Sequence, residues 1–275
     1  MVFSKVRTGD FGRRRPFLPR IQAELGLSDA GRSWVIAAYV LAFGGLMLLG
    51  GRLSDAFGRK RVFLAGVALF TATSIVCGAA GIEGTLVIGR VLQGAAAAVA
   101  SPTAMALIAT TFAAGKVRNQ AFAICAAMTG AGSVAGLIAG GLLTELTWRL
   151  VFLINVPAGI VVVIGAVVGL HESRGPRMRL DVPGALLGSL GCTAVVFGIT
   201  NAEHGLDRPL PWLAIGIGFA ALAAFVFVER TAEHPLLPLR LFADRSRTAA
   251  LTATLLAGAV IMVLASMPRS IYRTC

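Results

Sequence analysis

Long apolar stretches without charge alternate with short polar connections along most of the chain. A stretch of about 18 or more such residues is long enough to cross the hydrocarbon core of a bilayer as a helix. We expect eight membrane-spanning helices, at residues 34–51, 62–80, 84–112, 120–143, 150–170, 182–200, 211–228 and 248–268. Small residues recur at helical spacing, without the two-residue alternation of membrane strands. The predicted fold class is therefore all-α, a polytopic transmembrane helical bundle.

The composition agrees with a membrane protein. Hydrophobic residues make up 56% of the 275 residues and charged residues 14%, where a soluble protein carries about 25% charged residues. The 25 Lys and Arg against 13 Asp and Glu give a net charge of +12, which in a polar chain would suggest nucleic-acid binding. Here the cations lie between apolar stretches, so we interpret them as topology signals in a lipid bilayer and expect no nucleic-acid partner.

The basic residues gather on alternate loops. The loops after the first, third, fifth and seventh predicted spans carry Arg52, Arg59, Lys60, Arg61, Lys116, Arg118, Arg174, Arg177, Arg179, Arg230, Arg240, Arg245 and Arg247. The loops after the second, fourth and sixth spans carry only Arg149 and Arg208. The excess of cations in cytoplasmic loops assigns the first group to the cytoplasm. This orientation leaves the basic segment 1–33 outside, against the rule, and indicates that a helix is missing before residue 33.

The reactive side chains give no sign of an enzyme. The cysteines are scattered, at Cys77, Cys125, Cys192 and Cys275, and lack the spacing of a zinc site or a disulfide framework. No acidic cluster, and no nucleophile with an adjacent base, occurs at the end of a span. We expect no enzymatic activity, no metal and no cofactor.

The connection after the first span combines two glycines, a carboxylate and several cations. Gly51 allows another helix to approach closely, and Gly58 permits a tight turn. Asp55 is placed to accept hydrogen bonds from Arg59 or to face the N-terminus of a helix. A solvated, positively charged cytoplasmic loop is the alternative interpretation of the same residues.

Of the Lys, Arg, Asp, Glu and His side chains, Arg90 alone lies inside the predicted spans. A charge there costs at least ~2.5–3.5 kcal/mol on insertion scales, so we expect it to face the protein interior and to have a partner. Gln93, one helical turn later, extends the polar stripe, and Gly94 follows it. The alternative is that Arg90 extends to the outer headgroups, since it lies about two turns from the start of its helix.

The fourth span carries glycines at four-residue spacing, Gly132, Gly136 and Gly140, with Gly141 beside them. Such a face lets another helix backbone pack closely, although ordinary helix packing explains it equally well.

The run between the fourth and fifth spans begins with Trp148 and Arg149 and continues to Asn155 and Pro157. Trp148 suits an interfacial anchor and Pro157 a kink, whereas Asn155 needs a partner in the bundle.

In their order, these segments resemble the major facilitator superfamily, and specifically its fourteen-helix drug/proton antiporter branch. Residues 51–63 are similar to the GxLaDrxGrkxxl loop of that family, and residues 86–98 to its lxxxRxxqGxgaa motif. Residues 132–141 are similar to the gxxxGPxxGG antiporter motif, with Leu137 in place of the proline. Residues 148–157 match the WRxxFxINxP run of this branch.

The resemblance also predicts an organisation. Residues 1–17 match nothing in the family, and residues 18–22 are similar to the end of its first helix. The eight spans then correspond to family helices two to nine. Residues 34–170 form the N-terminal half, 171–246 two linker helices with a cytoplasmic loop, and 247–275 a truncated helix and tail. We expect a shortened version of a longer transporter, without its first helix and most of its C-terminal half.

The resemblance implies multidrug efflux in exchange for protons, with small hydrophobic or cationic substrates, in a bacterial cell membrane. It implies that Arg90, with Gln93 and Gly94, works with a carboxylate on the first helix. It also implies that the Asp55 loop latches an inward gate on the eleventh helix and that the Gly132–Gly141 face packs on the second half. Because these partners are not expected here, we expect no transport by this chain alone, unless a complementing chain supplies them. The alternative is a non-transporting membrane scaffold that oligomerises through Gly132, Gly136 and Gly140.

Overall fold

A computed structural model of the chain describes residues 24–25, 29–173, 182–202 and 209–231, with four single positions between 249 and 256. This part of the chain is helical, as predicted, and contains no strand. The helices are α2 (Asp29–Phe57), α3 (Arg59–Gly78), α4 (Glu83–Thr111), α5 (Lys116–Leu146), α6 (Arg149–Leu153), α7 (Asn155–Gly169), α8 (Val182–Ala202) and α9 (Pro209–Thr231).

Seven of the eight predicted spans coincide with these helices, with α6 and α7 together forming the fifth. The predicted span 248–268 lies outside the described residues, apart from single positions. Within the described ranges, five helices or joined helices are long and apolar enough to cross a membrane, and six if the two arms of α2 count as one span. Those arms, Trp34–Met47 and Leu49–Phe57, meet at an angle of 52°. In α8 the stretch Leu186–Ile199 is apolar but shorter than a full span.

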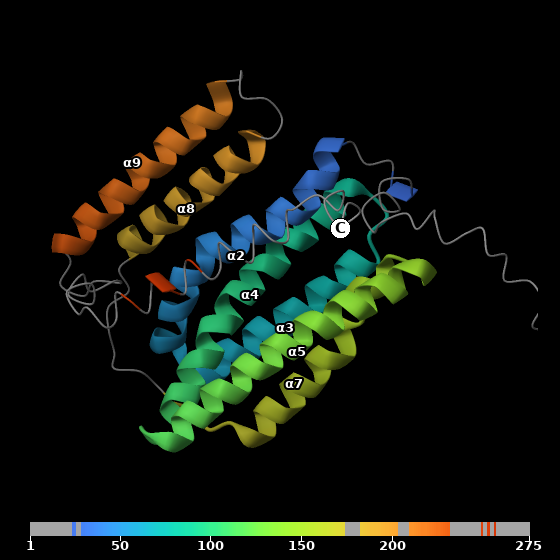
Figure 1. The fold of residues 1–275 in the computed structure, drawn as a ribbon, viewed down its shortest axis with the longest axis vertical. Coiled ribbons are helices and arrows are strands. Elements are labelled where there is room, and N and C mark those ends of the chain that lie inside the picture. Colours follow the sequence, from blue (N-terminus) through green and yellow to red (C-terminus); the bar gives the residue numbers. More distant parts are fainter. Residues whose placement is uncertain are drawn as a thin grey trace, which may run out of the picture.

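Neighbours along the chain are not always neighbours in space. α4 packs against both α2 and α3, and α7 packs on α3 (Figure 1). α8 packs on α2, and α9 packs on α8, so this helical pair is attached to the bundle through α2 (Figure 1). The central layer of α2, α4 and α3 therefore positions the polar side chains described below.

The crossing of α2 and α4 depends on glycine at two positions. A Cβ atom on Gly94 would meet the Tyr39 carbonyl and would lie 3.0 Å from Ala42 Cβ. A Cβ atom on Gly50 would meet the backbone of Ala98. The close approach predicted at Gly51 therefore occurs one residue earlier. At Gly51 itself an added Cβ would make only an ordinary contact with Pro102 of α4.

α5 stands apart from this central layer. It contacts α4 and α6, but no residue of its most apolar 18-residue stretch is buried. Its glycines have open space where a Cβ atom would lie, at Gly130, Gly132, Gly136, Gly140 and Gly141. The small-residue face predicted here is thus present, and no described residue packs on it.

A buried apolar cluster lies where α3 ends and where α4 and α6 begin. It contains Val35, Cys77, Ala80, Leu86, Trp148 and Phe152. Trp148 is only 2% exposed. The indole packs into this cluster with its ring edge-on to Phe152. Its expected role as an interfacial anchor stays a prediction.

Candidate functional site

The predicted basic loop at residues 51–61 is almost entirely helical. α2 continues to Phe57 and α3 begins at Arg59, so Gly58 alone makes the turn. Gly58 has a φ of 100°, a conformation that side-chain-bearing residues rarely adopt. Its N–H donates to the Ser54 carbonyl at 3.2 Å, and its carbonyl accepts from the Val62 N–H at 3.0 Å. The prediction of a tight turn at Gly58 is confirmed, although the loop around it is shorter than expected.

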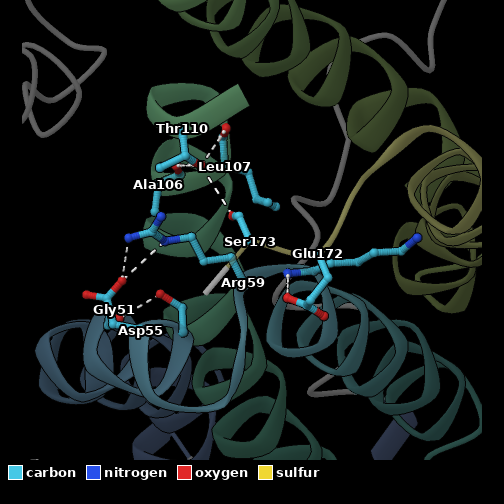
Figure 2. Close-up of polar contacts among 10 residues, drawn as sticks. Gly51, Asp55, Arg59, Ala106, Leu107, Thr110, Glu172 and Ser173 are labelled. Carbon is cyan, nitrogen blue, oxygen red and sulfur yellow. Dashed lines mark hydrogen bonds and ion pairs between the residues drawn. The ribbon is translucent and has the colours of Figure 1, made fainter. Parts of the chain in front are cut away.

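The carboxylate of Asp55 accepts hydrogen bonds from Arg59 across this turn. Arg59 Nη2 lies 2.7 Å and its Nε 3.2 Å from Asp55 Oδ1 (Figure 2). The side chains are 14% exposed for Arg59 and 30% for Asp55, so the ion pair is partly shielded from solvent. Of the two roles predicted for Asp55, the structure therefore shows the pairing with Arg59.

The chain after α7 docks on the same turn through reciprocal helix caps. Glu172 Oε1 accepts a hydrogen bond from the backbone N–H of Lys60, at 3.2 Å, in the first turn of α3. Lys60 Nζ donates in return to the carbonyls of Val167 and Leu170, at 2.8 and 2.6 Å, at the end of α7. A carboxylate thus meets the positive end of one helix dipole and an ammonium the negative end of another.

The third element in this arrangement is the end of α4. The Arg59 N–H donates to the Ser173 carbonyl at 3.2 Å, and the hydroxyls of Ser173 and Thr110 lie 3.4 Å apart. Figure 2 shows Thr110, Ser173 and Glu172 gathered around Arg59. We call Asp55, Gly58, Arg59, Lys60, Glu172, Ser173 and Thr110 the gating cluster, after the gating role that the family resemblance implies for this turn and that stays a prediction.

Glu172, Ser173 and Thr110 escaped prediction, and Lys60 was interpreted only as a topology signal. Glu172 lies 112 residues from Lys60 along the chain. No local pattern marks such a pair, because capping groups from distant segments leave no period in the sequence. The only local signal was the position of Glu172 just beyond the last apolar residue of a span, where a helix ends.

Arg90 faces the interior, as predicted, and is partly buried there. Its Nε donates to the Val35 carbonyl of α2 at 2.9 Å, and its Nη1 donates to Gln93 Oε1 at 2.8 Å. The guanidinium also lies 4.3 Å from the centre of the Tyr39 ring and 5.9 Å from that of Phe152, within the range of cation–π attraction. Carbonyl, amide and aromatic groups surround this charge.

A buried hydrogen-bond relay extends from Arg90 into α3. Gln93 Nε2 donates to Ser74 Oγ at 2.7 Å, and Ser74 Oγ donates to the Phe70 carbonyl at 2.8 Å. Gln93 is 1% exposed, and Ser74 is not exposed at all. The polar stripe predicted for Arg90 and Gln93 is therefore real. Among the described residues no carboxylate pairs with Arg90, so its expected partner on a first helix remains a prediction.

Trp148 and Arg149 bind a carboxylate at the opposite end of the bundle. Glu24 accepts hydrogen bonds from Trp148 Nε1 and from Arg149 Nη1, one on each oxygen. Arg149 Nη2 donates to the Ala80 carbonyl after α3, at 3.3 Å, and the guanidinium lies 4.5 Å from the centre of the Trp148 ring. We call Glu24, Ala80, Trp148 and Arg149 the Glu24 clasp. Sequence analysis did not single out Glu24.

The other two residues singled out in the 148–157 run, Asn155 and Pro157, lie in the first turn of α7. The helix breaks at Ile154, between α6 and α7, and Pro157 lies in the first turn of α7. Proline lacks the N–H that would bond to the carbonyl four residues earlier, at Leu153, so the break falls where the predicted kink requires it. Asn155 is partly buried, and its side chain makes no hydrogen bond with the residues that the structure describes.

Comparisons with known proteins give a consistent result. A family model described as Major Facilitator Superfamily matches residues 15–272. The MFS-type transporter EfpA of Mycobacterium tuberculosis is 56% identical over 251 residues, which are 90% of this chain and 47% of EfpA. The puromycin resistance protein of Streptomyces alboniger is 46% identical over 84% of this chain and 46% of its own length. The cephamycin export protein of Amycolatopsis lactamdurans is 43% identical over 88% and 51%. The chain spans about half the length of these curated relatives.

Proposed function

Because this chain belongs to the major facilitator superfamily of membrane transporters, we propose that it forms part of a drug exporter that exchanges its substrate for protons. Its relatives include a puromycin resistance protein and a cephamycin export protein. These names support export of small organic compounds, and the expected substrates are hydrophobic or cationic. The proposed location is the bacterial cell membrane.

The observation that carries this proposal is the interior position of Arg90. Arginine keeps its proton in proteins, so Arg90 acts as a fixed positive charge rather than as a proton carrier. A fixed charge inside a membrane protein favours the ionised form of a nearby carboxylic acid and disfavours a second cation. An acid that alternates between Arg90 and a bound proton would couple proton movement to substrate movement. Val35 and Gln93 hold the guanidinium in place for such an acid.

The gating cluster supports a second part of the same proposal. It ties the α2–α3 turn to the ends of α4 and α7, so these helices would move as one body when the transporter changes conformation. Two such bodies that rock about a central site produce alternating access. The open glycine face of α5 is where we propose that the second body packs.

Substrate-driven proton flux in proteoliposomes tests the role of Arg90. In a complete transporter that contains this sequence, Arg90→Ala should abolish coupled flux, because the fixed charge is lost. Arg90→Lys should restore part of it, because lysine keeps the charge but not the forked donor geometry. Lys116→Ala, which removes an exposed cation, is the control and should transport normally. Full flux in Arg90→Ala would reject the proposed coupling.

A separate measurement concerns the 275 residues alone. They span about half the length of the relatives, and alternating access needs two bodies, so we propose that they do not transport by themselves. Proton flux driven by substrate in liposomes that hold only this chain would contradict this.

A second candidate function is a membrane scaffold that assembles through α5. The observation in its favour is the open space at Gly132, Gly136 and Gly140. Single-molecule counting in lipid would show oligomers that Gly136→Leu disrupts. Monomers in both forms would reject the scaffold.

A further inference from the structure

The Glu24 clasp is continuous with the packing around Arg90. The rings of Trp148 and Phe152 meet edge-on, with centroids 6.2 Å apart and an angle of 88° between their planes. The Phe152 ring in turn lies 5.9 Å from the Arg90 guanidinium. Val35, whose carbonyl accepts from Arg90, belongs to the same buried cluster as both rings. A chain of direct contacts therefore joins the half-exposed Glu24 carboxylate to the partly buried charge of Arg90.

Glu24 supplies what Trp148 needs in order to be buried. The indole has one N–H donor and no acceptor, and a buried donor without a partner costs about 1–3 kcal/mol. Glu24 accepts from this N–H with one oxygen and from Arg149 with the other. Without the carboxylate, an indole N–H and a guanidinium at this end of the bundle would both lose an acceptor. Trp148 would then move towards water, and Phe152 would lose its edge-on neighbour.

We propose that Glu24 is a positioning residue: by fixing Trp148, it keeps the Phe152 ring against Arg90 and so determines how accessible that partly buried charge is. The consequence for transport rests on the proposed function. The consequence for the two side chains, Trp148 and Arg90, does not, and it is measurable in this chain by itself.

The clasp is sensitive to acid. Hydrogen bonds from Arg149 and then from Trp148 hold the pKa of the Glu24 carboxyl below its ordinary value of 4.5, against the opposing effect of partial burial. The bonds to the carboxylate are therefore complete at neutral pH and are lost as the pH falls below that value. Among the described side chains Arg149 pairs with Glu24, and Glu83, an acid at the same end of the bundle, lies beside Gly31 instead.

The experiment uses the 275-residue chain in nanodiscs, with Trp34→Phe and Trp212→Phe so that Trp148 is the only tryptophan. Iodide quenching of its fluorescence measures how exposed the indole is. Mass spectrometry after phenylglyoxal treatment measures how accessible the Arg90 guanidinium is. Glu24→Gln is compared with Glu83→Gln, which removes the same charge at the same end, and with Phe152→Leu, which interrupts the contacts between Trp148 and Arg90.

Glu24→Gln should raise both the quenching constant of Trp148 and the labelling of Arg90 by about threefold to tenfold, as expected for weakened hydrogen bonds to a half-exposed charged acceptor. Glu24→Asp keeps the carboxylate, so it should raise both signals less than Glu24→Gln does. Glu83→Gln should change neither signal, and Phe152→Leu should raise the labelling of Arg90 more than the quenching of Trp148. Unchanged labelling of Arg90 in Glu24→Gln would overturn the proposal, even if Trp148 became exposed.

If the Glu24 variants do not fold, a pH titration of the chain in which Trp148 is the only tryptophan tests the proposal instead. Quenching of Trp148 by iodide and hydroxyl-radical oxidation of Arg90, both measured at each pH, should rise together as the pH falls below 4.5, and Glu83→Gln should leave this transition in place. A flat response of either signal over that range would overturn the proposal.

Discussion

A single glycine separates α2 from α3, and both its backbone angle and its surroundings exclude a side chain. Gly58 has a φ of 100°, and a Cβ atom there would lie 2.7 Å from Glu172 Oε1. Gly115, between α4 and α5, has a φ of 122° but open space around it. Substitutions at the two glycines therefore distinguish the cost of backbone strain, which both share, from the cost of a collision with a neighbouring side chain, which only Gly58 has.

Gly58→Ala should lower the free energy of unfolding by about 1–3 kcal/mol from strain, with a further loss from the displaced Glu172. Gly115→Ala should show the strain alone. Thermal unfolding in detergent micelles measures both. In the Glu172→Ala background the two substitutions should become similar, and a persistent gap between them would contradict the role of the Glu172 contact.

Lys60 and Arg61 are neighbouring cations, and we expect them to contribute differently to stability. Its Nζ caps two carbonyls at the end of α7, whereas Arg61 is 71% exposed and lies 3.6 Å from Glu172. Lys60→Met should cost about 1 kcal/mol and speed hydrogen exchange near residue 170, because the end of α7 loses its cap. Arg61→Met should change little, since exposed ion pairs contribute little. Equal effects of the two substitutions would show that Lys60 acts only through its charge.

At the scale of the elements, glycines on α4 and α5 have opposite surroundings. Gly94 lies against the backbone of α2, whereas Gly136 faces open space. The same residue type in the same kind of helix therefore allows close packing at one site and occupies an unfilled face at the other.

Gly94→Ala should destabilise the chain by about 1–3 kcal/mol, because a methyl group there forces α2 and α4 apart. Gly136→Ala should be neutral or should stabilise α5 by up to about 1 kcal/mol, because alanine has the better helix propensity. Denaturant titration of the purified chain compares the two. Destabilisation by Gly136→Ala would indicate that another helix already packs on this face.

At the scale of the whole molecule, the two ends of the bundle differ in charge. No cation lies in the turn between α3 and α4 or in the first turn of α4, whereas the first turns of α3 and α5 carry Arg59, Lys60, Arg61, Lys116 and Arg118. We expect the gating cluster to face the cytoplasm and the Glu24 clasp to face outward.

Cysteine labelling tests this sidedness. Gly81 and Lys116 are exposed at opposite ends, so Gly81→Cys should react with an impermeant maleimide in intact cells, and Lys116→Cys only in inverted vesicles. The background replaces Cys125, Cys192 and Cys275 by serine, and the buried Cys77 serves as the unreactive control. Labelling of both positions from one side would overturn the assigned topology.

The described helices are largely those that the sequence predicts, whereas their ends and their contacts are not. The apolar stretches defined the spans, but the helices extend beyond several of them, to Phe57 in α2 and from Lys116 in α5. Charged residues at these ends pair with each other across the turns, as Asp55 at the end of α2 does with Arg59 at the start of α3. A search for uncharged stretches excludes such residues by its own criterion.

By itself the sequence determined that this is a bundle of membrane helices, that Gly58 turns the chain and that Arg90 faces inward. Each follows from local physics: the length of an apolar stretch, the φ that glycine tolerates and the cost of a charge in lipid. Only the tertiary structure decided that Glu172 caps α3, that Gly50 rather than Gly51 meets α4 and that Trp148 is buried against Phe152. Those contacts depend on how each helix is rotated about its axis and which distant segment lies beside it, and neither quantity is written in the spacing of residues along one helix.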